Sequence, residues 1–164
     1  MAQKPIQFRH NGEERAVFVA DGQNLLDVLR RGVGDLTPKF GCGQGSCGAC
    51  TVLIDGAPHL ACLTLAETVE GRAVDTVAGL AAGARLSPLQ DAFMTHFAAQ
   101  CGYCTDGMLM AAEALLRANP RPTREEVVEA ISGNLCRCTG YEAIIEAILD
   151  AAQSASGRSA SVRR

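Results

Sequence analysis

Residues 40–50 read FGCGQGSCGAC, and this stretch determines how the first half of the chain is interpreted. Gaps of four and two residues separate Cys42, Cys47 and Cys50, and Cys62 follows after eleven more residues. Glycines lie beside these cysteines at four positions: Gly41, Gly43, Gly45 and Gly48. Glycine adopts positive φ angles and allows close approach of the backbone. The loop is therefore suited to wrap around a bulky group and to point N–H groups at it.

This spacing favours a [2Fe–2S] cluster over a single zinc ion. A gap of four residues followed by a gap of two is the spacing of plant-type [2Fe–2S] ferredoxins, whereas zinc favours paired Cys-x2-Cys knuckles. The cluster is larger than one ion and negatively charged, so N–H groups directed at its sulfurs raise its reduction potential. Cys62 fits as the fourth ligand, delivered by a neighbouring strand. The alternative is an ordinary buried cysteine, a common fate of this residue type.

A second set of four cysteines lies after residue 100: Cys101, Cys104, Cys136 and Cys138. No cysteine lies between the two sets, so the sequence predicts two four-coordinate sites, one in each half. The motif at 101–104 is also typical of thioredoxin-like proteins, but that motif follows a strand and here a predicted helix precedes it. A zinc site with four thiolates stays open as an alternative. The one-residue gap between Cys136 and Cys138 favours a second [2Fe–2S] cluster, because it aims successive ligands differently.

Both cysteine pairs of this second set precede predicted helices, which begin near Met108 and Tyr141. Helix N-termini carry partial positive charge and free N–H groups, so two of them facing one site suit an anionic cluster. Thr105 and Thr139 each follow a cysteine at a position typical of a helix cap.

The apolar pattern of residues 1–76 predicts a sheet-containing domain, and the chain as a whole an α+β fold. One short helix, capped by Asn24, is expected within it. Alternating and β-branched runs predict strands at residues 6–8, 16–20, 51–54, 60–63 and 73–77. Residues 77–86 are predicted to be a linker, in which a short helix is possible.

Residues 87–152 predict a four-helix bundle, and residues 153–164 predict a flexible tail. Ser87 and Thr123 each begin a capping box, and the last helix, from Tyr141, has the clearest apolar stripe. One face of the first helix is expected to carry Leu86, Leu89, Phe93 and Phe97. The third helix is expected to bury Val127, Val128 and Ile131.

Composition excludes several functions. The net charge of −3 and the absence of tryptophan disfavour nucleic-acid binding, which requires clustered positive charge and stacking surfaces. No apolar run approaches the ~20 residues of a membrane-spanning helix, and polar residues 1–10 lack the core of a secretory signal. A cytoplasmic location is therefore expected, where eight cysteines favour ligands over disulfides. Surface or structural roles are predicted for His10, His59 and His96, and core roles for Met108 and Met110.

Three motifs resemble those of the iron–sulfur subunit of the molybdenum hydroxylases, the family of xanthine oxidase and carbon monoxide dehydrogenase: residues 41–52, 100–108 and 133–141. The resemblance covers nearly all of residues 5–152. It implies an N-terminal plant-type ferredoxin-like (β-grasp) domain and a C-terminal helical domain. It also implies one [2Fe–2S] cluster in each domain, with the eight cysteines as ligands.

The resemblance further implies partner subunits. A large subunit would carry a molybdopterin-type cofactor and oxidise the substrate, and a medium subunit would carry FAD, in a dimer of heterotrimers. The helical-domain cluster would lie nearer molybdenum and the ferredoxin-like cluster nearer the flavin, while Gln100 and Cys138 match positions that touch the pterin. No substrate site is expected on this chain itself. The alternatives are a stand-alone two-cluster electron carrier and a zinc-stabilised interaction module.

Asp106 departs from the family pattern, which usually has proline after the Cys-Thr of the second motif. An acidic residue is favourable at the start of a helix. Close to an anionic cluster, it is expected to lower the reduction potential or to alter the contact with a partner.

Overall fold

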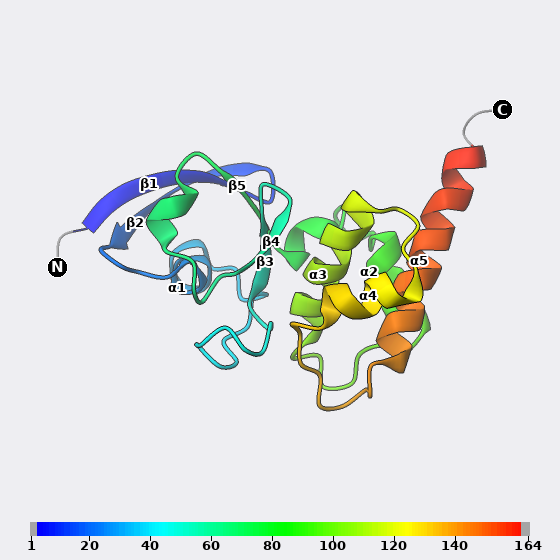
Figure 1. The fold of residues 1–164 in the computed structure, drawn as a ribbon. Coiled ribbons are helices and arrows are strands. Elements are labelled where there is room, and N and C mark those ends of the chain that lie inside the picture. The colour runs from blue at the N-terminus through cyan, green and yellow to red at the C-terminus, as the bar shows by residue number, and fades with distance from the viewer. Residues whose placement is uncertain (1–2, 162–164) are drawn as a thin grey trace.

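A five-stranded sheet and a group of four helices form two lobes of the chain (Figure 1). The computed structural model describes residues 3–161. The strands follow the spatial order β2-β1-β5-β3-β4, and all pairs are antiparallel except β1 with β5. Their bounds are β1 Gln3–His10, β2 Glu13–Ala20, β3 Thr51–Ile54, β4 Ala57–Leu60 and β5 Ala73–Asp75.

A short helical segment packs its apolar side chains against this sheet. Helix α1 (Leu25–Asp27) continues into the π-helical turn η1 (Val28–Val33), which ends at Gly34 in the left-handed conformation. Asn24 begins the segment as predicted, because its side chain accepts a hydrogen bond from the Asp27 N–H. The lobe's buried cluster joins this helix to the sheet through Phe8, Leu25, Leu26, Leu29, Val52 and Ile54.

The return strand of the second hairpin begins earlier than predicted. Asp55 and Gly56 both have positive φ angles and form a two-residue turn, so β4 starts immediately at Ala57. The predicted strand at 60–63 is therefore wrong beyond Leu60, because the chain turns there and the Leu63 N–H bonds back to the Leu60 carbonyl. The predicted linker contains one 3-10 turn, η3 (Val77–Leu80), and a second such turn, η2 (Ala66–Val69), precedes β5.

The second lobe contains the four predicted helices: α2 Pro88–Thr95, α3 Thr105–Ala118, α4 Arg124–Ile131 and α5 Glu142–Ser161. Both predicted capping boxes are present, Ser87 with Gln90 and Thr123 with Glu126. Met108 and Met110 are fully buried, which confirms their predicted place in the core. No helix in the described part of the chain is both long and apolar enough to cross a bilayer.

Several apolar side chains of this lobe face outward, contrary to prediction. Phe97 is 84% exposed, because α2 ends at Thr95 and the chain turns at Phe97 with a φ of 52°. Val128 is 45% exposed while its neighbour Val127 is buried, and Leu86 is also exposed.

Helix α5 continues through Ser161, beyond the end at residue 152 that the predicted tail implies. Residues 162–164 of the predicted tail lie outside the described residues.

Candidate metal centres

The N-terminal cysteines come together because of the β3–β4 hairpin. Cys42, Cys47 and Cys50 lie in the loop that precedes β3, and Cys62 follows β4. The hairpin register aligns the two strands, and the Ala61 N–H donates to the Cys50 carbonyl at 3.2 Å. Cys62 is thereby brought beside Cys50, as the sequence predicts for a ligand delivered by a neighbouring strand.

The four sulfurs of this set form two pairs. The Cys42 thiol contacts that of Cys47, and the Cys50 thiol contacts that of Cys62. The Gln44 N–H, followed by Ser46 and Cys47, lowers the pKa of Cys42 to about 6. Burial raises the pKa of Cys50 to about 12. One sulfur is therefore held by N–H donors at the surface, and another is enclosed in apolar surroundings.

Glycine is required in this loop by space as well as by conformation. A Cβ atom at Gly41 would lie 2.7 Å from the Cys47 sulfur, and one at Gly45 would lie 2.4 Å from a Leu63 methyl group. Gly45 also has a φ of 81°. The loop is thus wrapped closely around the sulfur atoms, in agreement with the interpretation of its glycines.

The second set is assembled at the starts of two helices. Cys101 and Cys104 precede α3, while Cys136 and Cys138 precede α5. The sulfurs of Cys101 and Cys138 lie 3.6 Å apart and are exposed, whereas Cys104 is buried and contacts Cys136. The sulfurs of the helical lobe therefore also form two pairs, Cys101 with Cys138 and Cys104 with Cys136.

Thr139 and Tyr141 hold Cys136 in place. The Thr139 hydroxyl lies 3.1 Å from the Cys136 sulfur, and the Thr139 N–H donates to the same sulfur at 3.4 Å. The Tyr141 hydroxyl accepts the Cys136 N–H at 2.9 Å. Burial opposes ionisation of Cys136, but hydrogen bonds from Thr139, Cys138 and Cys104 together outweigh it and lower the pKa of this thiol to about 7. Burial raises the pKa of Cys104 to about 12.

The expectation that two threonines cap helices needs correction. Cys104 is the N-cap residue of α3, without a side-chain capping bond, and Thr105 is the first residue of the helix. Thr139 accepts the Tyr141 N–H at 3.2 Å and contacts a sulfur, so it serves the cysteine site as well as the helix start. The sequence placed Tyr141 only at the start of the last helix, and its contact with Cys136 was not predicted. Its φ of 72° is the local feature that turns the chain into α5.

The pairing of sulfurs fits a two-iron group. Two sulfurs bound to one tetrahedral metal at about 2.3 Å lie about 3.8 Å apart, close to the spacing of Cys101 and Cys138. Two such pairs provide the ligands for two irons. The N–H donors to Cys42 and Cys136 suit the negative charge of a two-iron cluster. Among the described residues, no group of three or more His, Cys, Asp or Glu side chains is arranged to hold a single metal ion.

The two cysteine sites are in direct contact across the lobes. The Leu135 N–H donates to the Cys47 carbonyl at 2.9 Å, and the Asn134 side chain donates to the Gly48 carbonyl at 2.9 Å. A Cβ atom at Gly107 would lie 2.2 Å from the Gly48 oxygen, so glycine is the residue that permits this approach. The lobes therefore meet at the loops that carry the cysteines.

Gln100 and Cys138 are both exposed on the helical lobe, and Gln100 is next to Cys101 in the chain. Two of the histidines have structural partners. His10 is buried and donates to Asp35 at 2.9 Å, and His96 lies 2.9 Å from Asp150. Half-buried His59 lies in β4.

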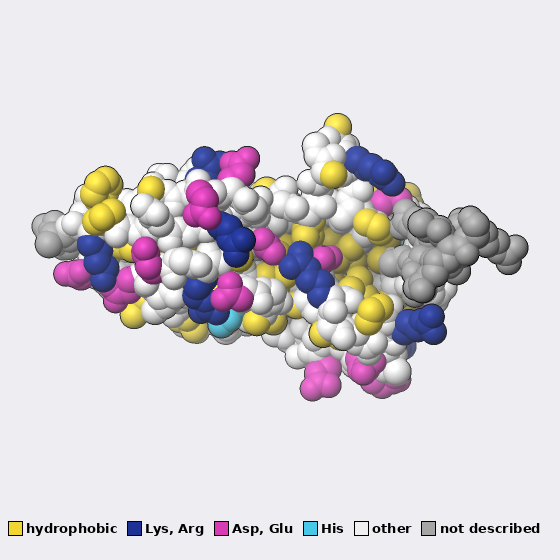
Figure 2. Space-filling model, turned by 90° about the horizontal axis from the view of Figure 1, so that it is seen from above, with side chains coloured by type: hydrophobic (Ala, Val, Ile, Leu, Met, Phe, Trp, Pro, Cys, Tyr) yellow, Lys and Arg dark blue, Asp and Glu magenta, His cyan; other side chains and the backbone are white. Residues whose placement is uncertain are grey.

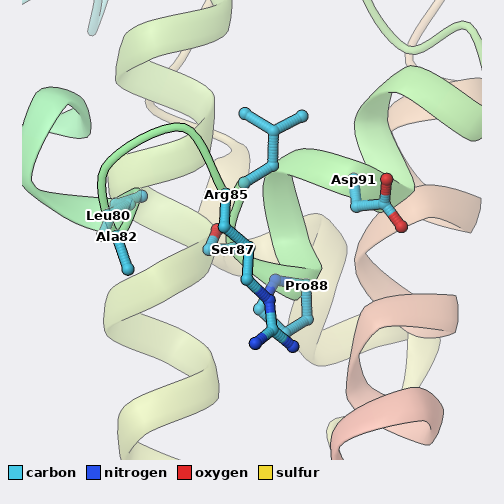
Figure 3. A pocket seen from close by; sticks show the side chains of 7 residues that line it. Leu80, Ala82, Arg85, Ser87, Pro88 and Asp91 are labelled. Carbon is cyan, nitrogen blue, oxygen red and sulfur yellow. The ribbon is translucent and has the colours of Figure 1, made fainter.

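A cavity of about 540 Å³ lies between the linker and α2. It is lined by Leu80, Ala82, Arg85, Leu86, Ser87, Pro88 and Asp91 (Figure 3). Figure 3 shows that the Asp91 carboxylate lies apart from the Arg85 guanidinium. The lining contains none of the predicted site residues.

Charged side chains are mixed on the surface. On the face drawn in Figure 2, Lys and Arg side chains are interspersed with Asp and Glu over the sheet lobe. Phosphate backbones are bound by clustered positive charge, so this face has a different character from a nucleic-acid interface.

Comparisons with known proteins agree with this geometry. Residues 8–78 match the model of the 2Fe-2S iron-sulfur cluster binding domain, and residues 76–149 match that of the [2Fe-2S] binding domain. The chain is 57% identical to the nicotine 6-hydroxylase small subunit of Paenarthrobacter nicotinovorans, over 89% of this chain and 88% of that one. It is 46% identical to the nicotinate dehydrogenase small FeS subunit of Eubacterium barkeri, over 87% and 91%.

A solved structure supports the same assignment. Quinoline 2-oxidoreductase from Pseudomonas putida 86 contains a chain that superposes with a TM-score of 0.92 and 51% identity, covering 96% of this chain and 98% of that one. Neither a stand-alone carrier nor a zinc module accounts for these matches. The chain belongs to the small iron–sulfur subunits of the molybdenum hydroxylases, in which two [2Fe–2S] domains transfer electrons within a multi-subunit oxidoreductase.

Proposed function

We propose that each cysteine set of this chain holds one [2Fe–2S] cluster. The ligands of the sheet-lobe cluster are Cys42, Cys47, Cys50 and Cys62, and those of the helical-lobe cluster are Cys101, Cys104, Cys136 and Cys138. When bound, each cluster takes up and releases one electron at a time. The observation that supports this most directly is the division of each set of sulfurs into two pairs.

The chain connects two partner subunits. A large subunit with a molybdopterin-type cofactor meets the helical lobe, and a medium subunit with FAD meets the sheet lobe. Exposure of Cys101 and Cys138 supports a partner contact at the helical site. We assign the pterin contact to Gln100 and Cys138, because both are exposed beside the outer sulfur pair and the Gln100 amide offers donors and an acceptor.

Exposed apolar side chains surround both cysteine sites. Phe40 and Leu63 lie against Gly43 and Gly45 of the sheet-lobe loop and are exposed. Near the helical cysteines, Phe97, Tyr103 and Leu135 are exposed. Apolar and aromatic residues of this kind are typical of permanent interfaces. They support a stable complex, which we propose to be a dimer of heterotrimers in the cytoplasm.

The cluster assignment is tested with serine variants in the co-expressed complex. Cys136→Ser should abolish one electron paramagnetic resonance (EPR) signal of the reduced complex, and Cys47→Ser should abolish the other. Loss of both signals, or of neither, in a variant that still assembles contradicts two separate sites. Co-purification of a pterin-bearing chain and a flavin-bearing chain tests the partner assignment, and a chain that purifies alone contradicts it.

We also propose that the complex hydroxylates an N-heteroaromatic ring. This rests on the similarity to subunits of enzymes for nicotine and nicotinate and to a chain of the quinoline enzyme. The substrate binds to the large subunit, so the assay uses the whole complex with a panel of pyridine and quinoline compounds and of aldehydes. Turnover of aldehydes alone would contradict this substrate class.

A further inference from the structure

One ion pair joins the segment before the first cysteine loop to the start of α3, directly after the cysteines of the second set. The Lys39 ammonium lies 2.5 Å from the Asp106 carboxylate, and the two side chains are only 29% and 21% exposed. Lys39 is three residues before Cys42, and Asp106 is two residues after Cys104. The pair therefore spans the lobes at the place where both proposed clusters are held.

The position of the Lys39 charge is fixed within the sheet lobe. Its ammonium also donates to the Leu36 and Thr37 carbonyls at 3.2 and 3.0 Å, so its three N–H groups all have acceptors. The Lys39 backbone N–H donates to the Ala49 carbonyl at 3.0 Å, beside Cys50. Arg30 holds the same segment by donating to the Leu36 and Pro38 carbonyls.

The Asp106 charge is fixed at the helical lobe. Asp106 lies in the first turn of α3, where a carboxylate is stabilised by the helix N-terminus. Left without a cation, this carboxylate would stand beside an anionic cluster and disfavour its reduction. When Asp106 is paired with Lys39, the two side chains together carry no net charge.

We propose that Lys39 and Asp106 are a positioning pair that sets the reduction potentials of the two clusters by balancing charge between their loops. This inference rests on the proposed cluster ligands. It keeps the expectation that the Asp106 charge by itself lowers the potential, and adds that the Lys39 charge offsets this effect. Cluster potentials respond to net charge, hydrogen bonding and solvent exposure, and the pair bears on the first of these.

A second ion pair across the lobes provides a matched control. Arg117, near the end of α3, lies 3.0 Å from Asp75 of β5. Eleven residues separate Arg117 from Asp106, about 16 Å along the helix. This pair also docks the lobes, but it is remote from the cysteine loops. A purely mechanical role of the Lys39 pair would be shared by the Arg117 pair.

The test is a redox titration of the purified complex, with both cluster signals followed by EPR. Lys39→Met should lower the potentials and Asp106→Asn should raise them, while the double variant should lie between the two single variants and close to the parent. Arg117→Met and Asp75→Asn should leave the potentials unchanged. Single variants that shift nothing, or that both shift in one direction, overturn the proposal.

Three outcomes separate the hypotheses. Control variants that move the potentials as far as the Lys39 and Asp106 variants also overturn the proposal, because docking alone would then explain the effect. Absence of cluster signals from the parent complex contradicts the proposed ligands themselves. Unshifted potentials with both signals present contradict only the role of the ion pair.

Discussion

The sheet-lobe cysteines are carried by one glycine-rich loop and one hairpin, whereas the helical-lobe cysteines are brought together from the starts of two helices. In the first site, the N–H donor at Cys42 comes from the loop backbone at Gln44. In the second, both the hydroxyl and the N–H of Thr139 act on Cys136. The comparison shows that a glycine-rich loop wraps the first site closely, whereas the second site depends on two helix starts and on Thr139, which supplies both a hydroxyl and a backbone N–H. Substitutions should therefore affect the two sites separately.

The largest difference between the two cysteine sites is expected when a glycine of the sheet-lobe loop is substituted. In Gly41→Ala the new methyl group would overlap the Cys47 sulfur, so the complex should lose the sheet-lobe EPR signal and keep the helical one. Gly133→Ala is the control, because a Cβ atom there meets nothing within 4 Å and the backbone is not left-handed. Retention of both signals in Gly41→Ala would refute the role of close wrapping.

An intermediate effect is expected from the buried Asp35 of the sheet lobe. Its carboxylate accepts hydrogen bonds from His10, Thr37 and Thr76. Burial alone would raise its pKa, but these bonds outweigh burial and hold the pKa well below its ordinary value. Asp35→Asn should destabilise the lobe by about 2 kcal/mol or more, since the amide keeps only one acceptor oxygen and places an NH2 group against the donors that the other oxygen accepted from. Denaturant unfolding of the complex, followed through the sheet-lobe signal, measures this loss.

The same carboxylate predicts an acid dependence. Because the folded-state pKa of Asp35 is depressed, its stabilisation is fully present above the ordinary value of 3.8 and decreases as the pH falls below that value. The parent lobe should therefore lose stability toward acid more steeply than Asp35→Asn. Parallel pH profiles for the two proteins would show that Asp35 does not contribute in this way.

The smallest effect is expected at Thr139. Thr139→Val removes one hydrogen bond to the Cys136 sulfur, a loss of about 1 kcal/mol. For one electron this lowers the helical-lobe potential by a value on the order of 40 mV and leaves the sheet-lobe potential in place. Thr105→Val is the matched control, since Thr105 occupies the first turn of α3 without a sulfur contact in the structure. An equal shift in both variants would contradict the assignment.

Much of this arrangement could be predicted because local chemistry dictates it. Cysteine spacing indicated the two sites, and the Ser87 and Thr123 capping boxes marked helix starts correctly. Errors arose where the chain turns without a strong signal. Phe97 adopts a positive φ angle, which is uncommon for an aromatic residue, and so its side chain lies away from the face that periodicity assigned to it.

The contacts between the lobes were beyond prediction for a different reason. Lys39 and Asp106 are 67 residues apart, and Leu135 meets Cys47 through backbone atoms that carry no sequence signal. Gly107 looked like an ordinary residue of a motif, yet its missing side chain allows the approach of Gly48. Such contacts depend on how the two folded lobes pack against each other.

Iron and acid-labile sulfide analysis of the purified complex tests the central claim most directly. The account predicts two irons and two sulfides for each set of four cysteines, and loss of half of both in Cys136→Ser. Zinc in place of iron, or iron for only one set in the intact parent complex, would contradict it.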